Sequence, residues 1–200
     1  DEQRERARAA HTFHGGEDEG GFAGVEPTDF IGYEELRTVS MVVGLRSDGH
    51  DITSAAEAMD VDIVLERSPF YGEMGGQVGD LGRISTEHAE LDVRGTVRTP
   101  ANVIVHRAHV TRGRISVGDR VVAQVEEGRR FDIARNHTAT HLLHMALRRV
   151  LGEHADQAGS LVAPDRLRFD FTHFSPLTDR ALADIESLVN RKVLEDLPVE

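Results

Sequence analysis

The chain has 200 residues, of which 39% are hydrophobic, and a formal net charge of −12 at pH 7. It is long enough to bury a core in one large or two small domains, and no apolar run predicts a membrane span or a signal peptide. The lack of cysteine excludes disulfides, and we expect a cytoplasmic protein. The negative charge disfavours non-specific adhesion to nucleic acid, so we expect no DNA partner, although arginines cluster between Arg107 and Arg135.

Residues 1–25 predict the end of a longer helix and a loop. Residues 1–10 are charged and contain alanine but have no N-cap, as expected for the tail of a helix that starts earlier. Residues 15–24 are acidic and rich in glycine, which favours a loop.

Residues 26–128 predict a small antiparallel β-barrel. In the run from Ala89 to Gly95, apolar residues alternate with charged ones, as a half-buried antiparallel strand requires. Several such segments are separated by Gly, Asp and Pro turns, which favours a barrel or a folded sheet. The predicted strands are 38–44, 61–66, 89–97, 102–110 and 120–126.

Residues 129–200 predict an α+β unit. A helix capped by Asp132 and stopped by Gly152 carries an apolar stripe. A strand is expected at 167–171 and a second helix at 178–194, with Asp179 near the start of that helix and basic residues near its end. The stripe on the first helix consists of Ile133, Ala139, Leu142, Leu143, Ala146 and Val150.

His137 and His141 stand four residues apart on the first of these helices. This spacing places both imidazoles on one face, where they can hold a metal ion, and zinc is the usual occupant of such pairs. Thr138 stands where the His-Glu-x-x-His metalloproteases have their general base, so the sequence disfavours a zinc protease. His144 is either a third ligand or a packed neighbour, and the neighbour is favoured. A packed or solvated histidine pair is the alternative for the whole motif.

Two further clusters surround this helix in the sequence. The run 69–82 contains Gly75 and Gly76 just before Gln77, which predicts either a backbone that approaches a ligand closely or a bulged hairpin between barrel strands. The run from His154 to Ser160, which contains Gln157, is on composition alone a loop between a helix and a strand.

These clusters, in this order, closely resemble alanyl-tRNA synthetases. The match runs from the Thr28-Asp-Phe-Ile-Gly-Tyr33 motif through the three clusters to Val189-Asn190 in the final helix. The resemblance implies the end of a tRNA-binding helical region, a barrel related to translation-factor barrels, and an editing domain of the second additional domain type found in class II synthetases. We expect this editing domain to be truncated at its C-terminus. The aminoacylation domain, which uses ATP and Mg²⁺, would precede Asp1.

The resemblance also implies an activity and a partner. The activity is hydrolysis of the ester in tRNA(Ala) wrongly charged with serine or glycine, and the partner is the acceptor end of that tRNA. His137 and His141 would share Zn²⁺ with a Cys-x-x-x-His pair expected beyond Glu200. The zinc would either orient the terminal adenosine or polarise the ester. With only half of the ligands, this chain is expected to bind zinc weakly and to be inactive by itself.

Roles for the remaining residues follow from the same resemblance. Thr140 and Gln157 are the candidate catalytic residues: Thr140 would line the amino-acid pocket, and Gln157 would position water or the ester. Gln77, Gly75 and Gly76 would bind substrate from a loop that closes the pocket. The alternative function is a non-catalytic module that holds the tRNA acceptor arm, with the helix of the histidine pair serving only as scaffold.

Overall fold

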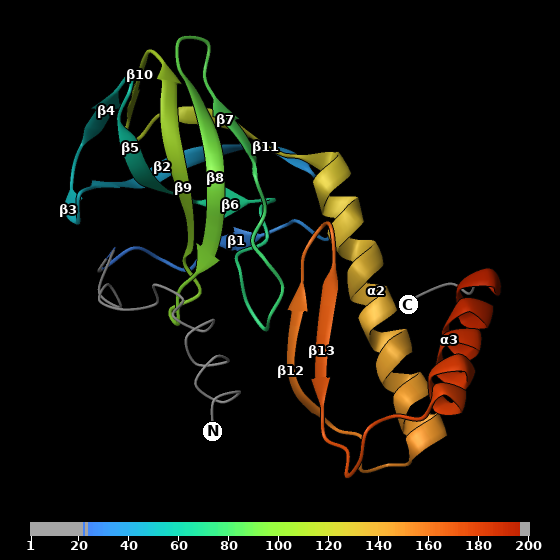
Figure 1. Cartoon of the computed structure of the whole chain (residues 1–200). Coiled ribbons are helices and arrows are strands. Elements are labelled where there is room, and N and C mark those ends of the chain that lie inside the picture. Colours follow the sequence, from blue (N-terminus) through green and yellow to red (C-terminus); the bar gives the residue numbers. More distant parts are fainter. Residues whose placement is uncertain (1–21, 23, 197–200) are drawn as a thin grey trace.

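The computed structural model describes residues 22 and 24–196. The predicted helical segment at 1–10 and most of the acidic loop lie outside the described residues. Figure 1 shows a barrel of strands and, below it, a smaller unit of helices and a hairpin. In the described part of the chain, no helix is long and apolar enough to cross a membrane.

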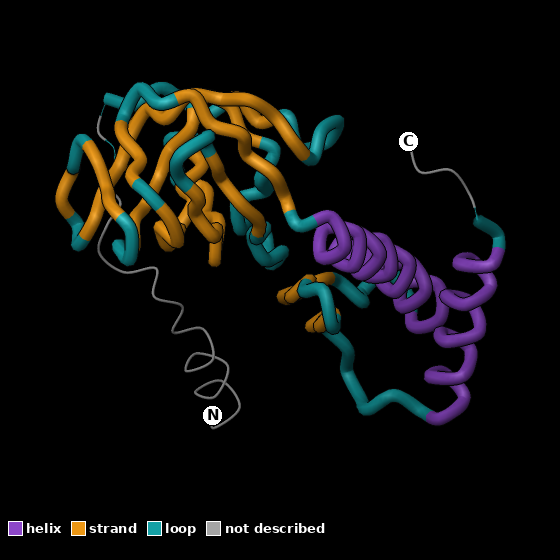
Figure 2. The backbone as a smooth tube through the Cα atoms, turned by 90° about the horizontal axis from the view of Figure 1, so that it is seen from above, coloured by secondary structure: helices purple, strands orange, loops and turns teal. Residues whose placement is uncertain are grey.

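The predicted antiparallel barrel is confirmed. Its six strands are hydrogen-bonded in the order β11-β7-β8-β9-β5-β2, and β11 pairs back with β2, so the sheet closes. Figure 2 shows the barrel from above. The bounds are β2 (Arg37–Ser47), β5 (Asp60–Leu65), β7 (Gly82–Ser85), β8 (Glu90–Arg98), β9 (Ile104–Arg112) and β11 (Arg120–Val125).

Shorter strands extend this barrel. The two-residue strand β3 pairs with β2, β4 pairs with β10, and β1 runs parallel to β6. These segments are too short to show an alternating pattern, and for that reason the sequence did not predict them. Their bounds are β1 (Asp29–Phe30), β3 (His50–Asp51), β4 (Ser54–Ala56), β6 (Arg67–Ser68) and β10 (Arg114–Ser116).

Alternation along the strands builds the barrel core. On β8, Leu91 and Val93 are buried while Arg94 is exposed, and the other long strands contribute buried Val, Ile and Leu residues in the same way. Burying one such side chain stabilises the fold by about 1.5–3 kcal/mol, so the barrel has a substantial core of its own.

The smaller unit contains the long helix α2 (Glu127–Leu151), the strands β12 (Gln157–Val162) and β13 (Leu167–Phe171), and the helix α3 (Asp179–Leu194). The strands form an antiparallel hairpin beside α2, and α3 packs on the other side of α2 (Figures 1 and 2). The side chain of Thr178 caps α3 by accepting a hydrogen bond from the Ala181 N–H at 3.2 Å. A second core joins these elements, with Ala146, Leu147, Ala155, Ile185 and Leu188 at its centre.

Two local predictions for this unit are wrong. The helix begins at Glu127 rather than at Asp132, because the chain passes from β11 almost directly into α2 and the Arg130 N–H already bonds the Glu126 carbonyl at 3.0 Å. Asp132 pairs with Arg135 instead. Residues 157–160 belong to a strand and not to a loop, since pairing with β13 supplies the order that their composition does not indicate. The predicted stop at Gly152 is confirmed.

Candidate active site

The helix α2, the β12–β13 hairpin and the glycine-rich loop between β6 and β7 enclose a pocket of about 260 Å³, here called the histidine pocket. It brings together residues predicted from three separate clusters of the sequence. Its lining comprises Tyr71, Met74, Gly75, Gln77, His137, Thr140, His141, His144, Gln157, Ser160, Val162 and Phe169. Of the sequence-predicted site residues, Gly76 alone is not part of this lining.

A buried ion pair fixes the glycine-rich loop to α2. The Arg130 guanidinium is paired with Asp80, which is 1% exposed, and its Nε lies 3.0 and 3.1 Å from the two carboxylate oxygens. The same guanidinium donates to the carbonyls of Gly32 at 2.6 Å and Pro69 at 2.7 Å. Asp80 also accepts the Tyr71 N–H at 2.7 Å. One helical side chain therefore holds both flanks of the loop, through the strong bonds that charged partners make.

The tip of the loop is a tight hairpin turn. Met74 and Gln77 exchange two backbone hydrogen bonds of 3.2 and 3.1 Å around Gly75 and Gly76, whose φ angles are +63° and +85°. Positive φ at both central positions suits a hairpin turn and favours glycine. The sequence left open whether this run forms a hairpin or approaches a ligand. The structure shows a hairpin turn, and Gly75 and Gln77 line the pocket.

The same tip is joined to β12 through its backbone. The Val162 N–H donates to the Gly76 carbonyl at 2.8 Å, and the Val78 N–H donates to the Val162 carbonyl at 3.0 Å. The loop thus adds a short parallel bridge to the hairpin edge. A barrel segment becomes one wall of a pocket whose other walls belong to the smaller unit.

The histidine pair is stacked and held by Gln77. The rings of His137 and His141 lie 5.0 Å apart with an interplanar angle of 21°. His137 Nδ1 is 2.6 Å from Gln77 Oε1, and because an amide oxygen only accepts, Nδ1 carries the proton and Nε2 keeps its lone pair. Burial and the neighbouring His141 both lower the pKa of His137, which favours the neutral imidazole that binds metals.

His144 lies one turn further along the helix. Its ring packs against Phe169 with centroids 5.1 Å apart, and its buried Nε2 has no hydrogen-bond partner among the described residues. Residues 22 and 24–196 contain no group of three or more His, Cys, Asp or Glu side chains that could hold a metal ion. This geometry agrees with His144 as a packed neighbour. The two imidazoles present fit one half of a tetrahedral zinc shell.

Thr140 and Gln157 both line the pocket, but they differ in exposure and in hydrogen bonding. Thr140 is buried and donates its only hydroxyl proton to the Asn136 carbonyl at 2.8 Å, so its oxygen can only accept from a ligand. Gln157 is exposed, and its amide nitrogen donates to the Ser160 hydroxyl at 3.2 Å. Ser160 is a pocket residue that the sequence analysis missed. Its position in a run whose composition indicated a loop gave no signal for a role in the site.

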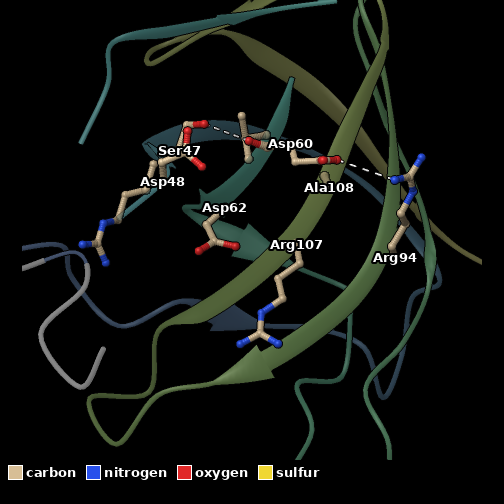
Figure 3. Close-up of a pocket in the computed structure, with 9 residues that line it drawn as sticks. Ser47, Asp48, Asp60, Asp62, Arg94, Arg107 and Ala108 are labelled. Atoms are coloured by element: carbon tan, nitrogen blue, oxygen red, sulfur yellow. Dashed lines mark hydrogen bonds and ion pairs between the residues drawn. The ribbon is translucent and has the colours of Figure 1, made fainter. Parts of the chain in front are cut away.

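A second hollow, of about 320 Å³, lies on the barrel, and none of the predicted site residues lines it (Figure 3). Basic and acidic side chains line it together. Arg94 lies 3.5 Å from Asp60, and Arg46 lies 3.2 Å from Asp51. Because three aspartates line the hollow beside its three arginines, it has no surplus of positive charge for phosphate, and the histidine pocket is the better candidate for chemistry.

The barrel and the appended α+β unit are consistent with a class II aminoacyl-tRNA synthetase. Residues 1–129 match the family described as tRNA synthetases class II (A), and the chain belongs to this family. The more particular likeness is to alanine–tRNA ligases, and it confirms the resemblance seen in the sequence motifs. The chain is 48% identical to that enzyme from Chloroflexus aurantiacus, over 99% of this chain and 22% of the relative.

Other relatives agree with this assignment. The alanine–tRNA ligases of Roseiflexus sp. and Halorhodospira halophila are 47% and 46% identical, each over 100% of this chain and over 22% and 23% of the relative. The chain therefore spans about a fifth of the length of the curated relatives it matches.

Proposed function

We propose that this chain contributes the editing site of an alanine–tRNA ligase, which hydrolyses the ester of tRNA(Ala) charged with serine or glycine. The observation that carries the proposal is the meeting of His137, His141, Gln77, Thr140 and Gln157 in one pocket. A second hydrolytic site is needed because a pocket that accepts alanine cannot strongly reject glycine or a residue with one added hydroxyl. The ATP- and Mg²⁺-dependent charging reaction is assigned to the part of the relatives that this chain does not span.

His137 would hold zinc through Nε2, which the contact of Nδ1 with Gln77 leaves available, and His141 would be the second ligand. A bound zinc ion would supply Lewis-acid polarisation of an ester oxygen. Two imidazoles leave the shell incomplete, so we expect the chain to need a Cys-x-x-x-His pair from elsewhere in the enzyme and to be inactive without it.

The protein side chains orient the ester and its attacking water. Gln77 fixes the ring position and tautomer of His137 through the 2.6 Å contact. The amide of Gln157 and the hydroxyl of Ser160 stand at the pocket wall, where they can hydrogen-bond a water or the ester. An activated acyl ester needs little more than orientation and electrostatic stabilisation, so no covalent nucleophile is required.

The test is hydrolysis of seryl-tRNA(Ala) by the full-length protein and its His137→Ala variant. We expect rapid deacylation that falls by at least about a hundredfold in the variant, in the range that loss of a catalytic electrophile produces. His88→Ala is the control, because the His88 side chain is 85% exposed in the turn between β7 and β8 and is not part of the pocket lining, so the rate should stay unchanged. Equal activity of all three proteins would exclude the editing site and leave the acceptor-arm scaffold as the function.

Thr140 is expected to select for serine. The Thr140 oxygen can only accept a hydrogen bond. Of the amino acids serine, glycine and alanine, only serine has a side-chain hydroxyl that can donate to it. Thr140→Val should slow deacylation of seryl-tRNA(Ala) by about tenfold, the value of one hydrogen bond, while the rate with glycyl-tRNA(Ala) changes by less than about twofold. Thr138→Val, on the exposed face of the same helix, is the matched control. Equal losses for both substrates would refute this role.

A further inference from the structure

A second pocket, of about 440 Å³, adjoins the histidine pocket and is here called the aromatic pocket. It lies between the start of α2 and the barrel segment that follows β1. Phe30, Tyr33, Tyr71 and Phe131 contribute its rings. Tyr71, Gln77 and His137 line both pockets, so the two hollows share a wall.

Two of the four rings are exposed, and Tyr33 is packed against a neighbouring ring. Tyr33 is 87% exposed and Phe131 is 48% exposed, so large flat faces meet solvent. Tyr33 packs edge-on against Phe30 at 5.0 Å, and Phe30 packs edge-on against Tyr71 at 6.2 Å. Exposed aromatic surface that is rigidly supported is typical of a binding surface.

The backbone next to these rings is fixed as well. The Gly32 carbonyl is bound by Arg130 at 2.6 Å, and a Cβ on Gly32 would lie only 2.3 Å from the Pro69 carbonyl oxygen. The turn that presents Tyr33 is therefore tied to the same guanidinium that positions the glycine-rich loop. Arg130 therefore positions a wall of each pocket.

The polar groups of the aromatic pocket indicate what kind of ring it takes. Exposed Glu34 and Glu35 line it, and carboxylates repel phosphate but accept hydrogen bonds from amino groups. The Arg130 guanidinium is already engaged with Asp80, Gly32 and Pro69. A planar, uncharged ring that carries an amino group satisfies both the aromatic faces and the carboxylates.

We propose that the aromatic pocket binds an unpaired nucleobase with an exocyclic amino group, at the single-stranded 3′ end of the RNA whose ester enters the histidine pocket. Stacking on aromatic side chains is the general way in which proteins hold splayed bases of single-stranded RNA. The shared wall of Tyr71, Gln77 and His137 lets the base and the ester of one RNA end occupy adjacent pockets. The identity of the ligand as RNA rests on the proposed function.

The test uses the tyrosines as reporters, because the sequence contains two tyrosines and both line this pocket. The 200-residue chain by itself is labelled with 3-fluorotyrosine and titrated with the RNA trinucleotide CCA while its ¹⁹F spectrum is recorded. We expect both fluorine signals to shift in a saturable way. We expect weaker binding of UUU, whose bases have no exocyclic amino group, and equal binding would overturn the role of Glu34 and Glu35.

Variants test whether the aromatic rings of the pocket are responsible for the binding. The double variant Tyr33→Ala, Phe131→Ala should bind CCA at least about fivefold more weakly, with the Tyr71 signal as the remaining reporter. Tyr33→Phe keeps the stacking face and should keep the affinity. Phe174→Ala is the matched control, because Phe174 is 88% exposed but stacks on His154 outside the pocket. Unshifted fluorine signals, or equal CCA affinity in the double variant, would overturn the proposal.

This titration needs neither zinc nor hydrolysis. If the full-length protein hydrolyses seryl-tRNA(Ala) but CCA leaves the fluorine signals unchanged, the nucleobase assignment fails and the editing proposal stands. If CCA binds as expected but His137→Ala does not affect deacylation, the editing proposal fails and the RNA-binding pocket remains.

Discussion

Gly76 has no space for a side chain. A Cβ there would lie 2.4 Å from the Ser160 carbonyl oxygen, which belongs to the β12 backbone and cannot rotate away. Gly75, its neighbour, also has a positive φ, but no atom lies within 4 Å of its Cβ position. Both positions thus need a positive φ, but only Gly76 lacks space for a Cβ. The sequence alone does not distinguish the two glycines.

Gly76→Ala should detach the loop from β12. The clash must push the tip of the loop away from β12. It therefore breaks the hydrogen bonds that the Val162 and Val78 N–H groups make between the loop and β12, and both amides should lose most of their protection from hydrogen exchange. Because Gln77 then leaves His137, deacylation by the full-length enzyme should fall by at least about tenfold. Both effects are measurable, by NMR and by a rate assay.

Gly75→Ala provides the comparison. It carries a similar strain of about 1–2 kcal/mol for a non-glycine residue at positive φ, but no clash, so protection at the two valines should persist. If both variants lose protection from hydrogen exchange, the positive φ angle, and not the close approach to Ser160, is the reason why the turn requires glycine.

The helix α2 joins the barrel to the smaller unit mainly through its first turns. Arg130 reaches Asp80 and two carbonyls, while Arg129 donates to the Gly79 carbonyl at 2.8 Å. At the middle of the helix, the Asn136 side-chain amide donates to the Ala163 carbonyl at 2.7 Å and so fixes the end of β12. The helix that carries the histidine pair therefore positions both other walls of the pocket.

Arg130→Met should destabilise the protein by about 3–5 kcal/mol, because Asp80 is left buried without its cation. Urea unfolding followed by circular dichroism measures this change. Arg135→Met is the matched control: its pair with Asp132 is exposed, and its loss should cost less than about 1 kcal/mol. If the two variants lose similar stability, the guanidinium is not the anchor inferred from the geometry.

Periodicity predicted the elements with an alternating or helical pattern, and it failed where the pattern is short. Strand β7 has only four residues between glycine-rich and polar segments, so alternation could not indicate it. The start of α2 was placed at Asp132 because that residue type caps helices, whereas contacts of Arg129 and Arg130 with the loop stabilise the preceding turns. Local propensity was overridden by tertiary contacts in that region.

Residues 22 and 24–196 contain three hydrophobic clusters, and the barrel also buries the polar side chain of His106. His106 is fully buried: its Nδ1 lies 2.9 Å from the Ile63 carbonyl and its Nε2 lies 2.7 Å from the Ser68 hydroxyl. The carbonyl can only accept, so Nδ1 carries the proton and Nε2 accepts from Ser68. Burial lowers the pKa of His106 to about 4, so the folded protein holds the ring neutral.

Acid should therefore destabilise the protein through His106. The unfolded chain binds a proton near pH 6.5 and the folded protein only near pH 4, so this contribution is complete above pH 6.5 and is lost as the pH falls toward 4. The loss amounts to about 3 kcal/mol. Urea unfolding at pH 7.5, 6.0 and 4.5 measures it.

His106→Met is the control, because it removes the titrating group and puts an apolar side chain in its place. Carboxylates also titrate below pH 5, so the quantity of interest is the difference between the two pH profiles. An identical fall in stability for both proteins between pH 6.5 and 4.5 would assign the acid sensitivity to other groups.

By itself, the sequence determined what depends on neighbours along the chain. Alternation indicated the long barrel strands, and the four-residue step put His137 and His141 on one helical face, because both patterns follow from the repeat of a single element. The tertiary structure alone decided which elements meet. Gln77 reaches His137 across 60 residues of chain, and Arg130 binds the turn of Tyr33 across 98 residues. No local pattern encodes such contacts, since they result from how the barrel closes and how α2 docks against its loop.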